Sequence, residues 1–430
     1  MRYSQIDNQL FVHNRKRFVE KMEPNSIAIF HSNYQYVLNG DALHKFHQNS
    51  DLYWLTGVAQ ENTVLILFPD APQNDWKEIL LVTETSDQIA TWEGYKLTKQ
   101  HASDISGIEN IRWNKGSLSS FRALINMAES IYLPLNENDR FSTNSPYKSM
   151  DAAHEIMRLF PLHQYKRAGQ ILQRLRAIKH PIELDLHRKA VAISKLGFER
   201  LMKFTKPGKW EFELEAELIH EYLNNRAFGF SFEPIIASGS SAVILHYVDN
   251  DKQIGEGDLI LLDNGVNYAN FASDMTRCIP ANGRFSARQK EVYDAVLNVM
   301  NYAKTILKPG EMLMDYHKKV QFEMQNQLID LGLISQTDLD NQKEELAATK
   351  KYFMHGTSHF LGIDVHDSGM RYEPLEENML LTIEPGIYIK EEGIGVRIEN
   401  NICLKHAENI DLMDEVNMPI TTEEIEQNMR

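Results

Sequence analysis

Cysteine is almost absent from this sequence, with Cys278 and Cys403 the only two among 430 residues. Two cysteines exclude a disulfide framework and a zinc site built from thiolates, and such scarcity is typical of proteins from a reducing compartment. The first residues, MRYSQIDNQLFVHNRKRF, lack an apolar h-region, and no later stretch approaches the ~20 apolar residues needed to span a bilayer. We therefore expect a cytoplasmic protein without secretion or a membrane anchor.

Positive charge is also scarce. The chain has 45 Lys and Arg against 60 Asp and Glu, which gives a formal net charge of -15. Nucleic acids and anionic membranes are bound by clustered Lys and Arg side chains, so neither is expected as a partner. The length of 430 residues is sufficient for two ordinary domains.

The first part of the chain has no glycine-rich phosphate loop or dinucleotide motif. Short apolar runs such as SIAIFH, TVLILF and EILLV alternate there with helical stretches, which predicts an α/β domain with a mixed sheet. The charged stretch from Met150 to Gly169 is predicted to be helical. We place an N-terminal domain with its linker helix at residues 1–170 and a second domain at residues 171–430, where Pro181 is placed to start a helix after a break at His180.

The second domain carries an internal duplication. A helix leading to Lys-Pro-Gly and then a second helix occurs around residues 206–208, and the same order recurs around residues 308–310. Each copy continues with a histidine-bearing segment and a hairpin that contains two acidic residues. Two such halves around a pseudo-two-fold axis would bring both hairpins to one central cleft.

In the first hairpin, the acidic residues are Asp263 and Asp274. A turn centred on Tyr268 and Ala269 would set the two aspartates directly opposite each other, so that both carboxylates share one face.

In the second hairpin, Glu384 and Glu399 take these places around a turn centred on Glu391 and Glu392. Four carboxylates so close together raise one another's pKa, whereas two divalent cations would cancel their charge. The acid pairs therefore predict a two-metal hydrolase.

Three histidines lie close together between the two acid pairs. His355 and His359 have the spacing of the HExxH zinc motif, but Gly356 stands where that motif needs its glutamate, so a helical zinc site is not expected. His359 with the four carboxylates makes an oxygen-rich set that suits manganese and also accepts cobalt, iron or zinc. A pair of such ions ~3.5 to 4 Å apart can hold a bridging hydroxide as the nucleophile and stabilise an oxyanion.

At these residues the sequence resembles a known family. ILHY, LLDNG, SDMTR, MHGTSHFLGIDVHD, LTIEPGIY and GVRIEN are similar to the successive motifs of the pita-bread metallopeptidases, specifically aminopeptidase P, the Xaa-Pro aminopeptidases. HQNSDLYWLTG resembles a stretch of that family's N-terminal domain, so the resemblance covers nearly the whole chain. It implies an α/β (α+β) protein in which an N-terminal α/β domain precedes a pseudo-two-fold pita-bread (creatinase/aminopeptidase) catalytic domain.

The resemblance also implies a set of metal ligands. Asp263 would bind one metal, Asp274 and Glu399 would bridge both, and His359 and Glu384 would complete the other site. The metals would be two divalent ions, manganese by preference.

Five residues are implied to act on the substrate. His246 and His366 would contact its carbonyl or stabilise the oxyanion, and His355 would line the site for the residue after the cut. Arg397 would support the glutamate bridge or the substrate, and Glu384 would carry the proton.

The expected substrate is a peptide with a free N-terminal amine and proline in second position. The amine would lie near Asp263 and Asp41. Related proteins form dimers or tetramers in which a neighbour's N-terminal domain narrows the cleft, so a homo-oligomer is expected, and Trp92 is a candidate for that contact or for ordinary packing.

Three alternatives share the fold. Prolidase has the same five ligands but cleaves Xaa-Pro dipeptides, and the metal motifs do not separate the two activities; the N-terminal resemblance favours the aminopeptidase. A metal-free binding module or scaffold would have lost ligands that this chain keeps. Creatinase-like amidinohydrolases do not need the four acidic residues.

Overall fold

The computed structural model describes residues 2–116, 121–138, 140–141 and 145–430, and the chain divides into two compact units. One unit is Ser4–Arg176. The other is Ala177–Arg430, to which Arg2 and Tyr3 also belong. Among the described residues, no helix combines the length and apolar character required to cross a bilayer.

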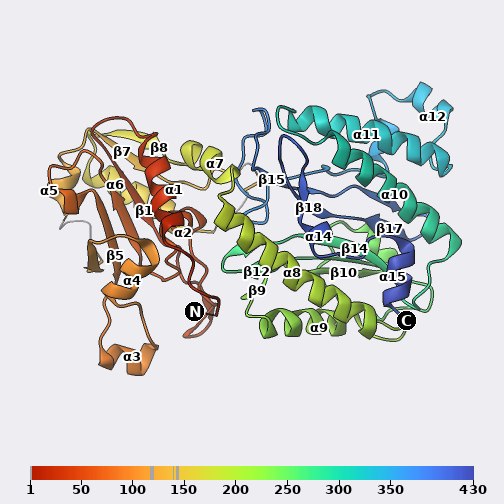
Figure 1. Cartoon of the computed structure of the whole chain (residues 1–430), viewed down its shortest axis with the longest axis horizontal. Helices are drawn as coiled ribbons and strands as arrows, with labels where there is room; N and C mark the ends of the chain where they lie inside the picture. The colour runs from red at the N-terminus through yellow and green to blue at the C-terminus, as the bar shows by residue number, and fades with distance from the viewer. Residues whose placement is uncertain (1, 117–120, 139, 142–144) are drawn as a thin grey trace. The chain divides into compact units, whose positions relative to one another are not determined.

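The N-terminal unit is built on a six-stranded mixed sheet (Figure 1). β1 is antiparallel to β4 and parallel to β7, which confirms the mixed sheet predicted from the sequence. The strands in spatial order are β6 (Ile111–Asn114), β5 (Glu78–Thr83), β4 (Val64–Leu67), β1 (Ser26–His31), β7 (Ser130–Leu133) and β8 (Gln164–Arg167). The central strands β1 and β4 are buried along nearly their whole length because both faces of the sheet are covered, which accounts for their unbroken apolar sequences.

Helices and a small hairpin surround this sheet. They are α1 (Gln9–Val19), α2 (Ser50–Thr56), α3 (Asp87–Glu93), α4 (Lys99–Ser106), α5 (Arg122–Ile125), α6 (Lys148–Leu159), α7 (Gly169–Ala177), β2 (Val37–Asn39) and β3 (Ala42–Leu43). The prediction of helix throughout Met150–Gly169 was wrong after α6, because the polar residues of β8 pair in parallel with β7 at the sheet edge. Pairing with a neighbouring strand overrides the weak helical pattern of that segment.

Two pairs of long helices frame the C-terminal unit. α8 (Pro181–Phe204) packs on α9 (Glu211–Asn224), and α10 (Ala287–Ile306) packs on α11 (Leu313–Asp330), on opposite sides of the strands in Figure 1. α8 begins at Pro181 with His180 as its N-cap, as predicted. Shorter helices follow: α12 (Gln336–Asn341), α13 (Ala347–Lys350), α14 (Leu412–Glu415) and α15 (Thr422–Asn428).

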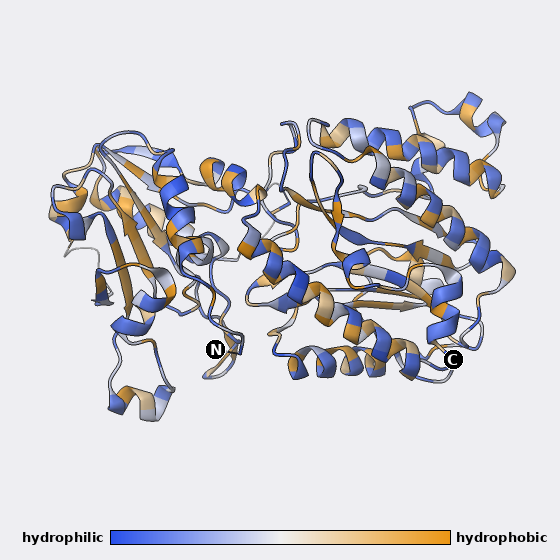
Figure 2. Cartoon of the chain, in the orientation of Figure 1, coloured by the Kyte–Doolittle hydropathy of each residue, from blue (hydrophilic) through white to orange (hydrophobic). Residues whose placement is uncertain are grey.

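The strands of this unit form several small antiparallel sheets. They are β9 (Gly229–Phe230), β10 (Ile235–Ser238), β11 (Leu259–Asn264), β12 (Val266–Tyr268), β13 (Phe271–Ala272), β14 (Met275–Pro280), β15 (Leu380–Ile383), β16 (Gly386–Ile389), β17 (Ile394–Arg397), β18 (Asn400–Cys403) and β19 (Ile410–Asp411). β11 and β14 of the first hairpin contact β17 of the second. Figure 2 shows these strands as largely hydrophobic, between helices that are polar on their outer sides.

The same backbone hydrogen bonds occur in both halves of the C-terminal unit. Gly208, before α9, donates its N–H to Ile254 O at 2.8 Å, and Gly310, before α11, donates to Leu375 O at 2.7 Å. The interval that separates Ile254 from Leu375 also separates Asp263 from Glu384. The predicted duplication is therefore confirmed down to individual hydrogen bonds.

The predicted register was wrong in the first hairpin. Asp263 pairs with Thr276 and not with Asp274, because the turn lies at Ala269 and Asn270, which both have positive φ. Asp274 still lies on the same face, since a shift of two positions preserves the alternation of side chains.

In the second hairpin the predicted register is confirmed. Gly386 pairs with Arg397 and Ile389 with Ile394, which places the turn around Glu391 and Glu392.

Candidate metal centre

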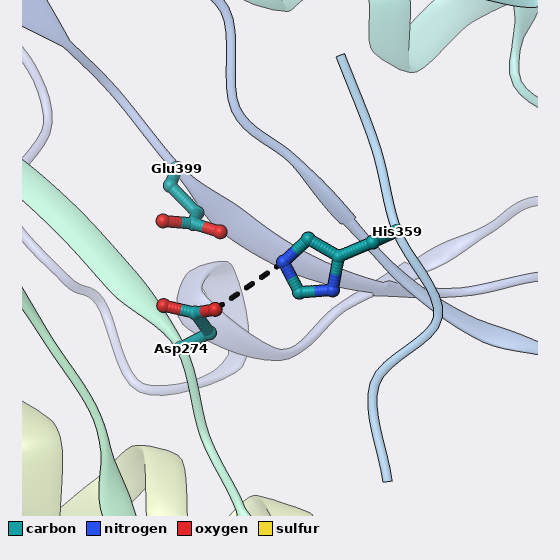
Figure 3. Close-up of side chains that lie close together, drawn as sticks. All are labelled: Asp274, His359 and Glu399. Carbon is teal, nitrogen blue, oxygen red and sulfur yellow. Dashed lines mark ion pairs between the residues drawn. The ribbon is translucent and has the colours of Figure 1, made fainter. Parts of the chain in front are cut away.

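Three buried side chains converge where the two hairpins meet. Asp274 directly precedes β14 and Glu399 directly precedes β18, whereas His359 lies in the segment between α13 and β15. One ligand atom from each lies within 4.8 Å of the others. Figure 3 shows the three side chains pointing toward one another, with His359 Nε2 3.4 Å from Asp274 Oδ2. The structure thus brings together residues from both hairpins and from the intervening histidine segment.

The other two predicted ligands lie beside this cluster. Glu384 Oε1 is 3.7 Å from His359 Nε2, and Asp263 forms an ion pair with Arg397. Three buried carboxylate oxygens, Asp263 Oδ1, Asp274 Oδ1 and Glu399 Oε1, have no hydrogen-bond partner among the described residues. A buried acceptor without a partner is costly, so these oxygens fit a site for divalent cations, which prefer such ligands.

Burial changes the acidity of this cluster. Burial and the nearby charge of Asp263 raise the pKa of Asp274 well above its usual range, and burial together with Asp274 and Glu384 does the same to the pKa of Glu399. Burial raises the pKa of Glu384 to about 7. Without a cation, these shifts favour the protonated carboxyl groups, whereas two positive ions would favour the ionised carboxylates.

Hydrogen bonding fixes the orientation of the His359 ring. Its Nδ1 lies 3.0 Å from Phe360 O and donates to that carbonyl. The lone pair of Nε2 is thereby turned toward Asp274 and Glu384. A backbone acceptor behind the ring is the usual support of a metal-binding histidine.

Arg397 joins the acidic residues of the two hairpins. Besides its ion pair with Asp263, its Nε donates to Thr276 Oγ1 at 3.2 Å, and Thr276 Oγ1 donates to Glu399 Oε2 at 2.7 Å. The expectation that Arg397 supports Glu399 therefore corresponds to an indirect contact in the structure. Thr276 was not singled out in the sequence, although it lies two residues after Asp274 and alternation along a strand gives both one face.

Tyr388 is a second residue that the sequence did not reveal. Arg397 Nη1 donates to Tyr388 Oη at 2.8 Å, and Tyr388 Oη in turn lies 2.8 Å from His355 Nε2 and donates to it. Burial and the charge of Arg397 lower the pKa of His355 to about 3, so this imidazole is neutral. The sequence did contain a signal for Tyr388. It lies four residues after Glu384, and residues separated by an even number of positions along a strand share one face.

The remaining predicted residues lie in different environments. The ring centroid of His366 is 4.5 Å from that of His359, in an edge-to-face arrangement. His246 is exposed. Asp41 and Trp92 are both exposed on the N-terminal unit, and their part in the site stays a prediction.

Comparisons with known proteins agree with this geometry. Residues 185–406 match the model of metallopeptidase family M24, and residues 11–132 match the aminopeptidase P N-terminal domain. The chain belongs to metallopeptidase family M24. Within that family it is of the aminopeptidase P type, a hydrolytic metallopeptidase with the pita-bread fold, as the sequence resemblance implied. Family membership and the buried Asp, His and Glu cluster together indicate divalent metal binding.

Relatives of the aminopeptidase P type match along nearly their whole length. The Xaa-Pro aminopeptidase of Haemophilus influenzae is 31% identical over 94% of each chain, and that of Escherichia coli is 30% identical over 95% of each. The structure of Pseudomonas aeruginosa aminopeptidase PepP superposes with a TM-score of 0.87 and 32% identity, covering 99% of this chain and 98% of that one. These relatives favour the aminopeptidase over the prolidase alternative.

Proposed function

We propose that this protein removes the N-terminal residue from peptides whose second residue is proline, with two divalent metal ions, manganese by preference. Asp263, Asp274, His359, Glu384 and Glu399 would hold the two ions. The observation that carries the proposal is the set of buried carboxylate oxygens around His359 that find no hydrogen-bond partner in the described part of a chain of the aminopeptidase P type. When bound, such a pair of ions supplies a hydroxide nucleophile near neutral pH and stabilises the charge that develops on the attacked carbonyl.

The side chains around the ligands have defined tasks in this proposal. His246 and His366 hold the substrate carbonyl, and neutral His355 lines the site for the residue after the cut. Glu384, whose burial raises its pKa to about 7, carries the proton from the attacking group to the proline nitrogen. Arg397 and Thr276 keep the carboxylates of Asp263 and Glu399 in place.

Proline in second position explains why such a site is needed. Its nitrogen has no N–H to donate, and its ring disfavours the extended binding mode of general peptidases. The proline nitrogen is also a poor leaving group until it is protonated, a step that an adjacent carboxylic acid can perform. The free amine of the substrate would be held by the acidic cluster near Asp263, with Asp41 as a further candidate.

Peptide cleavage by the manganese-loaded protein tests this function. We expect release of the first residue from an Xaa-Pro-Xaa tripeptide, little cleavage of the same peptide with an acetylated amine, and little cleavage when alanine replaces proline. A prolidase would capture the proline carboxylate and prefer the Xaa-Pro dipeptide. A strong dipeptide preference would overturn the proposal, and no cleavage with both metals bound would favour a binding module. Size-exclusion chromatography with light scattering would test the expected dimer or tetramer.

A further inference from the structure

A buried ion pair lies next to the loop that carries His366. Lys179 Nζ is 2.8 Å from Asp367 Oδ2, and the two side chains are 3% and 2% exposed. Burying two charges is costly, and apolar residues of similar volume often give equal or greater stability. Stability alone therefore does not account for this pair, and its position suggests a role in the site.

The pair closes a loop that backbone hydrogen bonds already tie to the metal centre. Asp367 N donates to Phe360 O at 2.9 Å, which joins the two ends of the loop at residues 360–367. Gly362 O accepts from Ala272 N at 2.9 Å, and Ala272 lies two residues before Asp274. The loop thus begins directly after His359 and contacts the strand that leads to Asp274.

Gly362 shows how closely the ion pair fits the loop. A Cβ atom at this position would lie 1.8 Å from Asp367 Oδ2 and 2.9 Å from Lys179 Nζ. The carboxylate therefore packs against the Cα of Gly362, where no side chain has room. The ion pair occupies one fixed place inside the loop.

Lys179 approaches this loop from another segment of the C-terminal unit, which backbone contacts hold in place. Its backbone N–H donates to Asn378 O at 2.8 Å, and the preceding residue, Ile178, forms a bridge with Met379. Helix α8 starts two residues later, at Pro181. The lysine ammonium group is consequently held by a segment that does not belong to the loop.

We propose that Lys179 and Asp367 are positioning residues for His366. The imidazole of His366 directly precedes the anchored Asp367 and packs edge-to-face on His359, with ring centroids 4.5 Å apart. Anchoring the Asp367 carboxylate sets the direction in which the loop presents this imidazole. The inference rests on the proposed function, in which His366 holds the substrate carbonyl.

Three variants separate positioning from simple stability: Lys179→Met, Asp367→Asn and the double variant. Each single variant removes the charge of one partner only, so its melting temperature should fall, whereas the double variant restores charge balance and should recover most of that loss. If the pair positions His366, kcat falls about 10- to 100-fold in all three, the double variant included, while KM and metal content change little. A kcat that recovers with the melting temperature would overturn the proposal, and so would loss of bound metal in the double variant.

A spectroscopic measurement makes the inference independent of turnover. In zinc-loaded protein with 13C-labelled histidine, the His366 resonance is assigned by its absence from the His366→Ala variant. We expect one sharp His366 signal in the wild type and a shifted or broadened signal in the double variant. An unchanged signal would overturn the positioning role. Absence of peptide cleavage by the wild type would instead refute the proposed function, and the spectra would still decide the question of positioning.

Gly362→Ala gives a second, independent disturbance that leaves both charges in place. The added methyl group meets the carboxylate, so we expect the same fall in kcat and the same change in the His366 signal. Gly257→Ala is the matched control, because a Cβ there would have no atom within 4 Å from any described residue other than its chain neighbours. Wild-type kcat and an unchanged signal in Gly362→Ala would contradict the proposal.

Discussion

The two halves of the C-terminal unit share one frame but hold their histidine segments differently. In the first half, the buried Glu211 carboxylate at the start of α9 accepts hydrogen bonds from Ser238 N at 2.7 Å, Tyr247 Oη at 2.7 Å and Lys252 N at 3.0 Å. These contacts hold the residues next to His246 in place, while His246 itself is exposed. In the second half, the Lys179–Asp367 pair anchors the loop of His366, which is half-buried.

The halves also differ in the metal ligands that they are proposed to offer. Thr382 donates its N–H to His359 O at 2.9 Å, while Leu261, at the same place in the first half, pairs with Ala237. The first half therefore has alanine where the second half has its imidazole. The repeated order of helices and strands determines where the acid pairs lie. Single residue differences and loops then give the two halves different side chains at equivalent positions.

Removing either of the two carboxylates that are proposed to bridge the metals, one in each half, should have the largest effect. Asp274→Asn and Glu399→Gln are each expected to abolish metal binding at the pair and to lower kcat/KM by about 10³-fold or more, because the ions supply several kcal/mol of transition-state stabilisation. Elemental analysis and peptide cleavage measure both effects, with the exposed Asp185→Asn as control. Full metal content with near-normal turnover in either variant would remove that residue from the bridging role.

The acid pairs should also make the metal-free protein sensitive to pH. The folded-state pKa of Glu384 is raised from 4.5 to about 7, so between these values the folded state binds more protons than the unfolded state. The contribution of Glu384 to the free energy of unfolding is fully present below pH 4.5 and is lost as pH rises through about 7, by up to about 3 kcal/mol. Asp274 and Glu399 act in the same direction.

Calorimetry of chelator-treated protein with and without manganese tests this effect. Because bound cations replace the protons, the rise in melting temperature on adding manganese should be larger at pH 8 than at pH 5. A metal-free protein that is more stable at pH 8 than at pH 5 would contradict the raised pKa values of these carboxyl groups.

The two histidines that are proposed to contact the substrate allow a direct comparison of the halves. His246→Ala and His366→Ala should each keep both metals and lower kcat by about 10²-fold, the effect of removing one donor to an oxyanion. Loss of metal in His366→Ala would show that His366 is a ligand. Wild-type turnover in either variant would leave that histidine with a structural role only.

The sequence predicted those features that depend on local pattern. Apolar runs located β1, β4 and β5, and the repeated Lys-Pro-Gly located the two halves. The contacts of Arg397 with Asp263 and Tyr388 could not be predicted from the sequence. The hairpins must pack before Arg397 and Asp263 meet, and the pattern of each strand alone does not show this.

The register error in the first hairpin has a local cause. Ala269 and Asn270 have φ of 54° and 64°, the conformation of a tight hairpin turn, and asparagine is among the few residues that tolerate it. Asn270 was therefore the signal for the turn centre. The second turn uses Gly393 at φ 62° instead, where glycine adopts the conformation freely.

Substitutions in the two turns are expected to have the smallest effect of the variants considered. Asn270→Ala and Gly393→Ala should each lower the free energy of unfolding by about 1 kcal/mol, because the left-handed conformation that both positions require is unfavourable for alanine. The Cβ at residue 393 would have only ordinary contacts, at 3.6 Å or more from Ser240, so the cost there comes from the backbone alone. Urea unfolding measures both variants, and Asn270→Gly should restore the stability that Asn270→Ala loses. If Asn270→Ala were neutral while Gly393→Ala destabilised the protein, the first turn would not depend on the residue at its centre, and the observed register would have to be set by packing of the strands.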